Sequence, residues 1–396
     1  MVKELLEQRR LPELMKMKDG SDVTPEKWPE RRLELVDILA EYQYGRMPAY
    51  TGKTTAVVER SEEAAAGKAV TQLVKITFPT PDGESFTFPI NLTIPKTATG
   101  YSPAPAFVFI SFGFPKYYPM EEIVDNGVIV AEMVMNDVAA DREDHYEGGM
   151  APHYINDGKR EADTFGKIGM WAFGASRVLD YLLTLDCVDK DRVGVMGHSR
   201  LGKTALWAGA NDERFTHVFS NDSGCSGAAI TRMKVGETFP RIAKVFPYWF
   251  NETMQTISTS VEASESVPFD QHFLIAAIAP RKAYVASAME DSWADPYSEY
   301  LACHAASPAW ELFGMDGFCA PNRLPIPDEE YTEGNLGYHL RPGTHFLSRY
   351  DWIRYIRFLK DEEEWEDLPF LDGEFLGKNF LIKVFPQTPF QKLSVK

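Results

Sequence analysis

Cysteine is scarce in this sequence of 396 residues, and the few cysteines present are not spaced like metal ligands. The four are Cys187, Cys225, Cys303 and Cys319. They form no C-x-x-C pair, which argues against a zinc knuckle and against a thioredoxin-like redox motif. An even count permits two disulfides, but in a chain of this length we expect buried free thiols.

An excess of positive charge is also missing. The 41 Lys and Arg residues are outnumbered by 58 Asp and Glu residues, which gives a formal net charge of −17. Nucleic acids and anionic membranes are bound largely by neutralising their phosphates with basic side chains. We therefore expect no nucleic-acid partner and no membrane partner, although a local pocket can still be basic.

Long apolar runs are absent as well. No stretch of 18 apolar residues occurs, so no transmembrane helix is predicted. Residues 1–20 are charged throughout and lack the apolar region of a signal peptide. The chain as it stands is expected in the cytoplasm, or outside the cell if a signal peptide has been removed. Its oligomeric state is left open.

What the chain does contain is a series of short apolar strands that alternate with helical patterns. Residues 69–78 and 86–94 form a predicted hairpin, and strands are expected at 106–112, 127–134, 192–196, 217–221, 282–288 and 337–340. Helices are expected at 28–44, 165–185, from Lys203, near 269–278, from Asp295-Pro296 and at 349–359. Two segments, 136–163 and 313–331, show little periodicity and are expected to be long loops, which are often functional.

This order of elements predicts an α/β fold. We expect a three-layer sandwich around a mainly parallel sheet, with the N-terminal hairpin as an antiparallel edge. Residues 1–50 are predicted to form an N-terminal helical arm, and residues 51–396 the catalytic domain.

One segment carries two motifs at once. Residues 197–204, GHSRLGKT, match the phosphate-binding P-loop pattern G-x-x-x-x-G-K-[ST]. The same residues also open a nucleophile elbow, the strand–turn–helix junction that presents a catalytic serine. The P-loop interpretation is disfavoured because bulky residues occupy the loop interior, and because the motif follows several strands rather than an early one.

The elbow interpretation makes a demand that the rest of the chain meets. In α/β-hydrolases the catalytic residues come in the order serine, acid, histidine, with the acid after a later strand and the histidine in a loop near the end. Here Ser199 is followed by Asp291 after the strand at 282–288, and by His345 in a Gly/Pro-containing loop before the last helix. We therefore predict an α/β-hydrolase with a Ser-His-Asp triad.

The elbow departs from the usual G-x-S-x-G at one position. Leu201 replaces the second glycine, which has moved to Gly202, and Arg200 directly follows the serine. An oxyanion hole usually employs the backbone N–H after the nucleophile. Arg200 could add a charged side-chain donor to the same oxygen.

Five spaced motifs, GHSRLGK, SNDSGCSGAA, GET, DSWADP and RPGTHF, resemble the bacterial branch of the glucuronoyl esterases, carbohydrate esterase family 15. The resemblance runs from about Phe165 to Trp352. It implies a serine esterase that cleaves esters of 4-O-methyl-glucuronate on xylan with lignin alcohols, through an acyl-enzyme and without metal or cofactor. The implied partner is a glucuronoyl ester or another carbohydrate derived from glucuronoxylan.

The resemblance also implies roles for individual residues. Ser199 is the expected nucleophile, His345 the base and Arg200 the oxyanion stabiliser. Lys203 and Glu237 are expected to contact the hydroxyls of the glucuronoyl ring, and Trp293 to line the sugar site. No metal ligands are expected.

The triad acid has two candidates. Fungal members of the family place a Glu just before the SG that follows the elbow helix, and here that position is Asp222. Other bacterial members use an acid after the later strand, which matches Asp291, and we favour this residue. Many fungal members also have a disulfide-bonded Cys before the nucleophile, where this chain has His198.

The sequence leaves three alternative functions open. The same fold and triad could remove acetyl groups from xylan-type sugars. The chain could be a non-catalytic carbohydrate-binding relative, which the presence of all three triad residues disfavours. It could also be the P-loop nucleotide binder.

Overall fold

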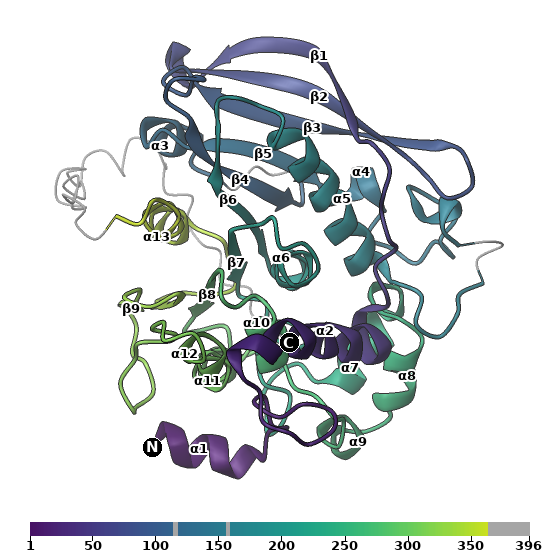
Figure 1. Cartoon of the computed structure of the whole chain (residues 1–396), viewed down its shortest axis with the longest axis vertical. Helices are drawn as coiled ribbons and strands as arrows, with labels where there is room; N and C mark the ends of the chain where they lie inside the picture. Colours follow the sequence, from purple (N-terminus) through teal and green to yellow (C-terminus); the bar gives the residue numbers. More distant parts are fainter. Residues whose placement is uncertain (114–117, 156–158, 363–396) are drawn as a thin grey trace, which may run out of the picture. The chain divides into compact units, whose positions relative to one another are not determined.

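The computed structural model describes residues 1–113, 118–155 and 159–362. In this part of the chain ten strands form one sheet, in the order β1-β2-β3-β5-β4-β6-β7-β8-β10-β9 (Figure 1). The strands are β1 (Thr55–Ala64), β2 (Ala69–Pro79), β3 (Ser85–Pro95), β4 (Ala104–Ser111), β5 (Ile129–Val134), β6 (Val188–His198), β7 (His217–Asn221), β8 (Lys282–Ala288), β9 (Glu329–Tyr331) and β10 (Leu336–Arg341). The predicted α/β sandwich is confirmed.

The N-terminal edge of the sheet is antiparallel, as predicted, but it contains one more strand than expected. β2 and β3 form the predicted hairpin, and β1 pairs antiparallel with β2. β1 was missed because its sequence, TAVVERSEEA, is charged and nearly all of its residues are exposed. A strand with so little buried surface lacks the apolar alternation by which strands are recognised.

The middle of the sheet is parallel. β4 pairs with β5 and β6, β6 with β7, β7 with β8, and β8 with β10. Alternate residues of β4 enter two separate cores: Val108 and Ile110 belong to the larger one, Phe107 and Phe109 to the smaller. Both faces of these strands are thus covered, which explains their almost uninterrupted apolar sequences.

Helices cover the two faces unequally. α5 and α6 pack on the face of the larger core, whereas α13 contributes Trp352 and Tyr355 to the smaller core on the other face (Figure 1). The helices are α1 (Val2–Arg9), α2 (Trp28–Leu39), α3 (Met120–Asp125), α4 (Met135–Val138), α5 (Lys167–Leu182), α6 (Arg200–Asn211), α7 (Phe239–Val245), α8 (Thr253–Ile257), α9 (Val261–Glu265), α10 (His272–Ala276), α11 (Pro296–Ala306), α12 (Pro308–Glu311) and α13 (Arg349–Lys360).

Most predicted helices are confirmed, with one shift that matters for the site. The helix expected from Lys203 begins three residues earlier, at Arg200. The segment predicted as one helix over 28–44 continues from α2 into a π-helical turn, Ala40–Tyr44. α1, α3, α4, α7, α8, α9 and α12 were not predicted, because short helices offer too few turns for a periodic pattern.

Residues 1–360 form one compact unit, and Trp28 and Leu35 of the N-terminal segment belong to its larger core. The division into an arm over 1–50 and a catalytic domain over 51–396 stays a prediction, and residues 363–396 lie outside the described part. All four cysteines are free, as expected, but only Cys225 and Cys303 are buried. Among the described helices, none has both the length and the apolar character needed to cross a membrane.

Candidate active site

Four side chains singled out in the sequence follow the carboxyl ends of neighbouring strands. Ser199 follows β6, Asp222 follows β7, Asp291 follows β8 and His345 follows β10. These strands run parallel and are adjacent in the sheet. Because the carboxyl ends of parallel strands meet at one edge, residues up to 146 positions apart gather there, which is the usual place of a ligand site in an open α/β sheet.

The serine occupies a strained turn. Ser199 lies between β6 and α6 with φ 58° and ψ −126°, a conformation that L-residues rarely adopt. Its backbone N–H donates to the Asn221 carbonyl at 2.8 Å, which ties the turn to β7. Gly197 is required here, since a Cβ at that position would lie 2.2 Å from the Leu201 carbonyl oxygen. This is the geometry of a nucleophile elbow.

The displaced second glycine has its own packing reason. A Cβ on Gly202 would lie 3.0 Å from Ser223 Cβ and 3.1 Å from the Asn221 carbonyl oxygen. Gly202 therefore lets α6 approach the turn after β7 closely. In the P-loop interpretation Arg200 and Leu201 would lie inside the phosphate-binding loop, but here both belong to the first turn of α6. The backbone therefore does not form the open loop of amides that binds phosphate in a P-loop.

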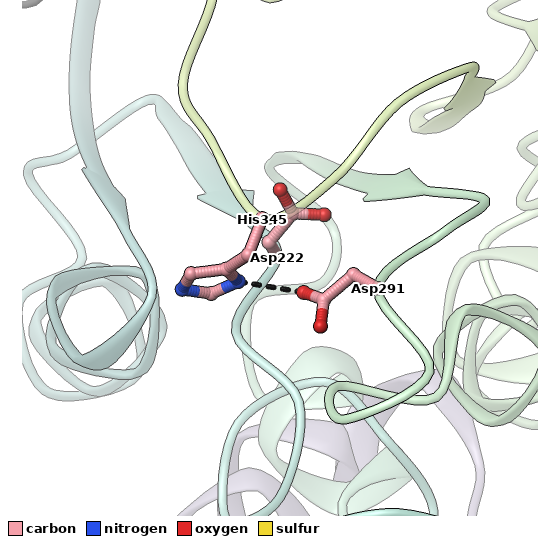
Figure 2. A group of neighbouring side chains, drawn as sticks. All are labelled: Asp222, Asp291 and His345. Carbon is pink, nitrogen blue, oxygen red and sulfur yellow. Dashed lines mark hydrogen bonds and ion pairs between the residues drawn. The ribbon is translucent and has the colours of Figure 1, made fainter. Parts of the chain in front are cut away.

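The predicted base and its favoured acid are hydrogen-bonded. His345 Nδ1 lies 2.6 Å from Asp291 Oδ2, and Figure 2 shows this contact as the dashed line. Burial by itself would raise the pKa of the Asp291 carboxyl. The hydrogen bond and charge of His345, together with the N–H of Ala294, outweigh this effect, so the pKa lies below its ordinary value. Asp291 is therefore ionised at neutral pH and can orient the ring with Nδ1 protonated and Nε2 free to accept a proton.

Asp222, the alternative acid, is engaged elsewhere. Its Oδ1 accepts the backbone N–H of Ala288 at 2.7 Å, and its Oδ2 accepts Arg341 Nη2 at 3.0 Å. In Figure 2 its carboxylate stands beside the pair, without a dashed line to His345. The geometry thus supports Asp291, and gives Asp222 the role of counter-ion to a buried arginine.

Arg341 fastens the loop that carries the base. Its side chain is 5% exposed and donates to the carbonyl oxygens of Pro342, Thr344 and Phe346, on both sides of His345. Its Nε donates to Asp351 Oδ1 at 3.1 Å. With Asp222 as the second carboxylate partner, all three nitrogens of this guanidinium donate hydrogen bonds. The position of the loop around His345 therefore depends on Arg341.

The His198 ring packs against the His345 ring. The two ring centroids lie 4.5 Å apart, and His198 Nδ1 lies 2.7 Å from Asn221 Oδ1. Burial, together with the charge of His345, lowers the pKa of His198 to about 3. His198 is therefore neutral at neutral pH and can support the imidazole of His345, the predicted base, without competing for its proton.

Ser199, Arg200 and His345 line one cavity of about 250 Å³, together with His198. The rest of its lining comes from the end of β4 and from the residues after His345, namely Phe109, Ile110, Ser111, Phe112, Phe346 and Leu347. Among the described residues no hydrogen bond joins Ser199 to His345. Such contacts are commonly long in enzymes without substrate and tighten when substrate binds.

The three predicted sugar-binding residues lie outside the lining of this cavity. Lys203 is 4% exposed, and its Nζ donates to the Ser223 carbonyl at 2.5 Å, so it is not a solvated surface residue. Burial lowers the pKa of Lys203, while the charge of Glu237 opposes this effect. Glu237 and Trp293 are joined through their backbones at 3.0 Å, and the Trp293 side chain is 52% exposed, which excludes a core role for it.

Asp222, Asp291 and His345 also place one ligand atom each within 4.8 Å of one another, a spacing that a metal ion could use. Their donors argue for another role. Each carboxylate already accepts hydrogen bonds, and the Arg341 guanidinium stands beside Asp222 where a cation would be repelled. The cluster is better described as an acid–base pair with a neighbouring ion pair.

Sequence reasoning missed Arg341, the packing role of His198, and the residues around Arg200, namely Asp141 and Trp249. Asp141 lies in the irregular segment over 136–163, which was expected to be a long loop, but nothing in that segment marked this residue. Arg341 is the first residue of the RPGTHF motif, and its place in that motif was the signal that could have found it.

Comparison with known proteins gives a consistent family. The sequence model of the family described as "Glucuronyl esterase, fungi" matches residues 78–314, more than half of the chain. A carbohydrate esterase from an unknown prokaryotic organism is 34% identical over 390 residues, covering 88% of this chain and 88% of the relative. The 4-O-methyl-glucuronoyl methylesterase of Hypocrea jecorina is 28% identical, and the match covers 77% of this chain and 63% of that protein.

Solved structures agree with the sequence relatives. The glucuronoyl esterase from Solibacter usitatus superposes with a TM-score of 0.79 at 33% identity, covering 89% of this chain and 98% of that one. A promiscuous esterase of carbohydrate esterase family 15 from a marine bacterial metagenome gives a TM-score of 0.78 at 31% identity, covering 88% and 96%.

The ion pairs of Arg341 lead to a prediction about stability. Arg341→Met should lower the free energy of unfolding by about 3–5 kcal/mol, because it leaves the buried, ionised Asp351 without its guanidinium partner and removes the donor to Asp222. Urea unfolding followed by circular dichroism measures the change. The matched control is Arg60→Met, since Arg60 and Glu62 are 67% and 60% exposed. That variant should stay within about 0.5 kcal/mol of the parent protein, and equal losses in the two variants would contradict the role given to Arg341.

Proposed function

Because this chain belongs to the glucuronoyl esterase family, we propose that Ser199, His345 and Asp291 form the triad with which it hydrolyses glucuronoyl esters. The observation that carries this assignment is the hydrogen bond between His345 Nδ1 and Asp291 Oδ2 at the edge where the strained Ser199 elbow ends β6. The substrate we propose is an ester of 4-O-methyl-glucuronate on a xylan-derived carbohydrate, with an alcohol of the lignin type.

The triad would act in two steps. His345 Nε2 takes the proton of Ser199 Oγ as that oxygen bonds to the ester carbonyl carbon, and the resulting imidazolium is stabilised by ionised Asp291. The tetrahedral intermediate collapses, and the alcohol leaves with the proton from His345. Water then attacks the acyl-enzyme by the same route, which releases the uronic acid and returns the proton to Ser199.

The negative charge that develops on the carbonyl oxygen needs donors. The Arg200 backbone N–H is at the first position of α6, where no helical acceptor is available to it. The positive end of the helix dipole points to the same place. The Arg200 side chain lines the cavity with Ser199 and would add a charged donor, which suits the oxyanion better than the neutral ester.

The proposal is tested by hydrolysis of benzyl glucuronate, methyl glucuronate and an acetylated xylan side by side, with Ser199→Ala as the control. We expect turnover of the glucuronate esters by the parent protein, and a loss on the order of a millionfold in Ser199→Ala. An intact far-UV spectrum of the variant shows that the fold is kept. Retention of more than about a tenth of the activity would exclude Ser199 as the nucleophile.

The same experiment separates the second candidate function. The second candidate is removal of acetyl groups from xylan-type sugars by the same triad. An esterase described as promiscuous is among the similar structures, which favours testing a second class of ester. Faster hydrolysis of the acetylated xylan than of both glucuronate esters would favour the acetyl esterase.

The two carboxylates give a ranking that can be measured. Asp291→Asn should lower kcat by roughly 10³–10⁴-fold, because an amide holds the imidazole in the wrong tautomer. Asp222→Asn should lower kcat much less and act mainly on stability, since Asp222 pairs with Arg341. Steady-state kinetics on benzyl glucuronate and urea unfolding of both variants give the comparison. The reverse ranking of kcat would move the acid to the position used by the fungal relatives.

Lys203 and Glu237 would hold the hydroxyls of the uronate ring, with Trp293 beside them. Contacts present in both ground and transition states affect KM, so Lys203→Met should raise KM for glucuronate esters with little change in kcat. A simple aryl acetate has no ring to hold and should be hydrolysed as by the parent protein. Kinetics on both substrates decide the matter: equal impairment on the aryl acetate would mean that Lys203 supports the turn at Ser223 rather than the substrate.

A further inference from the structure

We propose that Asp141 is a positioning residue for the reaction, which sets the place of the Arg200 guanidinium beside the nucleophile. This inference rests on the proposed function, because it assigns to Asp141 an effect that is exerted through Arg200. Asp141 belongs to the loop after β5 and α4, far in sequence from the elbow and from the triad.

The contacts around Asp141 are specific and use both of its oxygens. Oδ2 accepts Arg200 Nη1 at 2.5 Å, and Oδ1 accepts the indole N–H of Trp249 at 2.7 Å. The Asp141 side chain is 10% exposed and that of Arg200 is 29% exposed, so this ion pair is largely screened from water. A carboxylate fixed at two points can hold a guanidinium in one place more firmly than a free surface partner can.

Aromatic rings surround the rest of the Arg200 guanidinium. Its central carbon lies 4.8 Å from the Trp249 ring, and Trp249 stacks on Phe246 with ring centroids 3.8 Å apart. Phe112, which lines the cavity of Ser199, stands 5.5 Å from the same carbon. The rings restrict where the guanidinium can lie without taking its hydrogen-bonding groups, so Asp141 is left to decide its orientation.

The loop that carries Asp141 is firmly held, which a positioning role requires. Lys167 Nζ, at the start of α5, donates to the carbonyl oxygens of Ala140 and Arg142 and to Asp144 Oδ1. The indole N–H of Trp171 donates to the Ala139 carbonyl at 2.8 Å. The residues on either side of Asp141 are therefore anchored to α5, one of the helices that pack on α6.

Only one nitrogen of Arg200 is used in this contact. Within the described residues Nη1 alone is hydrogen-bonded, so the guanidinium keeps other N–H groups that could serve a developing oxyanion. An arginine without Asp141 would turn toward water, and its place relative to Ser199 would no longer be set. The loss should fall on kcat rather than on KM, since the oxyanion exists only in the transition state.

A double-mutant cycle tests the proposal. Asp141→Asn should lower kcat for benzyl glucuronate by about 10-fold with KM within about 2-fold, whereas the same substitution in an Arg200→Ala background should cost less than about 2-fold. The second readout is the rate at which a fluorophosphonate labels Ser199, since labelling needs the oxyanion donors but no uronate. The same non-additivity is expected there.

Glu143→Gln is the matched control, because it removes a carboxylate from the same loop that accepts the backbone N–H of His145 and, among the described residues, bonds neither Arg200 nor Lys167. Its effects should be additive with Arg200→Ala. Parent-like kcat in Asp141→Asn, or a loss that persists unchanged in the Arg200→Ala background, would overturn the proposal. Labelling of Ser199 without glucuronate hydrolysis would remove the proposed substrate alone, and a parent protein that is not labelled would overturn both.

Discussion

The geometry of this site depends on one buried arginine. Arg341 ends β10, and its guanidinium meets a carboxylate from the turn after β7 and another from α13, Asp222 and Asp351. Leaving such a charge unpaired in the interior would cost several kcal/mol, so the three elements that supply these groups must come together. The donors that remain fasten the loop around His345. The place of His345, the proposed base, is therefore a consequence of satisfying a buried charge.

The same requirement organises the rest of the edge. Asp351 also accepts His339 Nε2 and the Asn221 side chain, and Asn221 in turn accepts His198. One connected polar network thus runs beside Ser199 and His345. Networks of this kind are stable only when all members are satisfied, which makes them rigid. A rigid network suits the proposed reaction, in which Ser199 Oγ and His345 Nε2 must meet the substrate in a narrow range of positions.

Charge is distributed unevenly in this acidic protein. Arg200 is placed by a carboxylate and aromatic rings, and Lys203 is buried against a backbone carbonyl. Both lie on the first turn of α6, whose dipole adds positive potential at the same end. The result is a local site suited to an ester of a uronic acid within a chain whose net charge is −17. Overall composition argues against nucleic acids and anionic membranes as partners, but it could not reveal this local feature.

The sequence by itself determined the order of the apolar strands and of the longer helices, the elbow at Ser199, and the order of serine, acid and histidine along the chain. These features are local, since apolar periodicity and a strained Gly-x-Ser turn are encoded by consecutive residues. Tertiary structure alone decided which carboxylate meets His345, because Asp222 and Asp291 both follow parallel strands, and Asp222 is held instead by Arg341 and the Ala288 backbone. It also decided that Asp141 reaches Arg200, a contact across 59 positions that depends on how a loop is anchored to α5 and that no local pattern encodes.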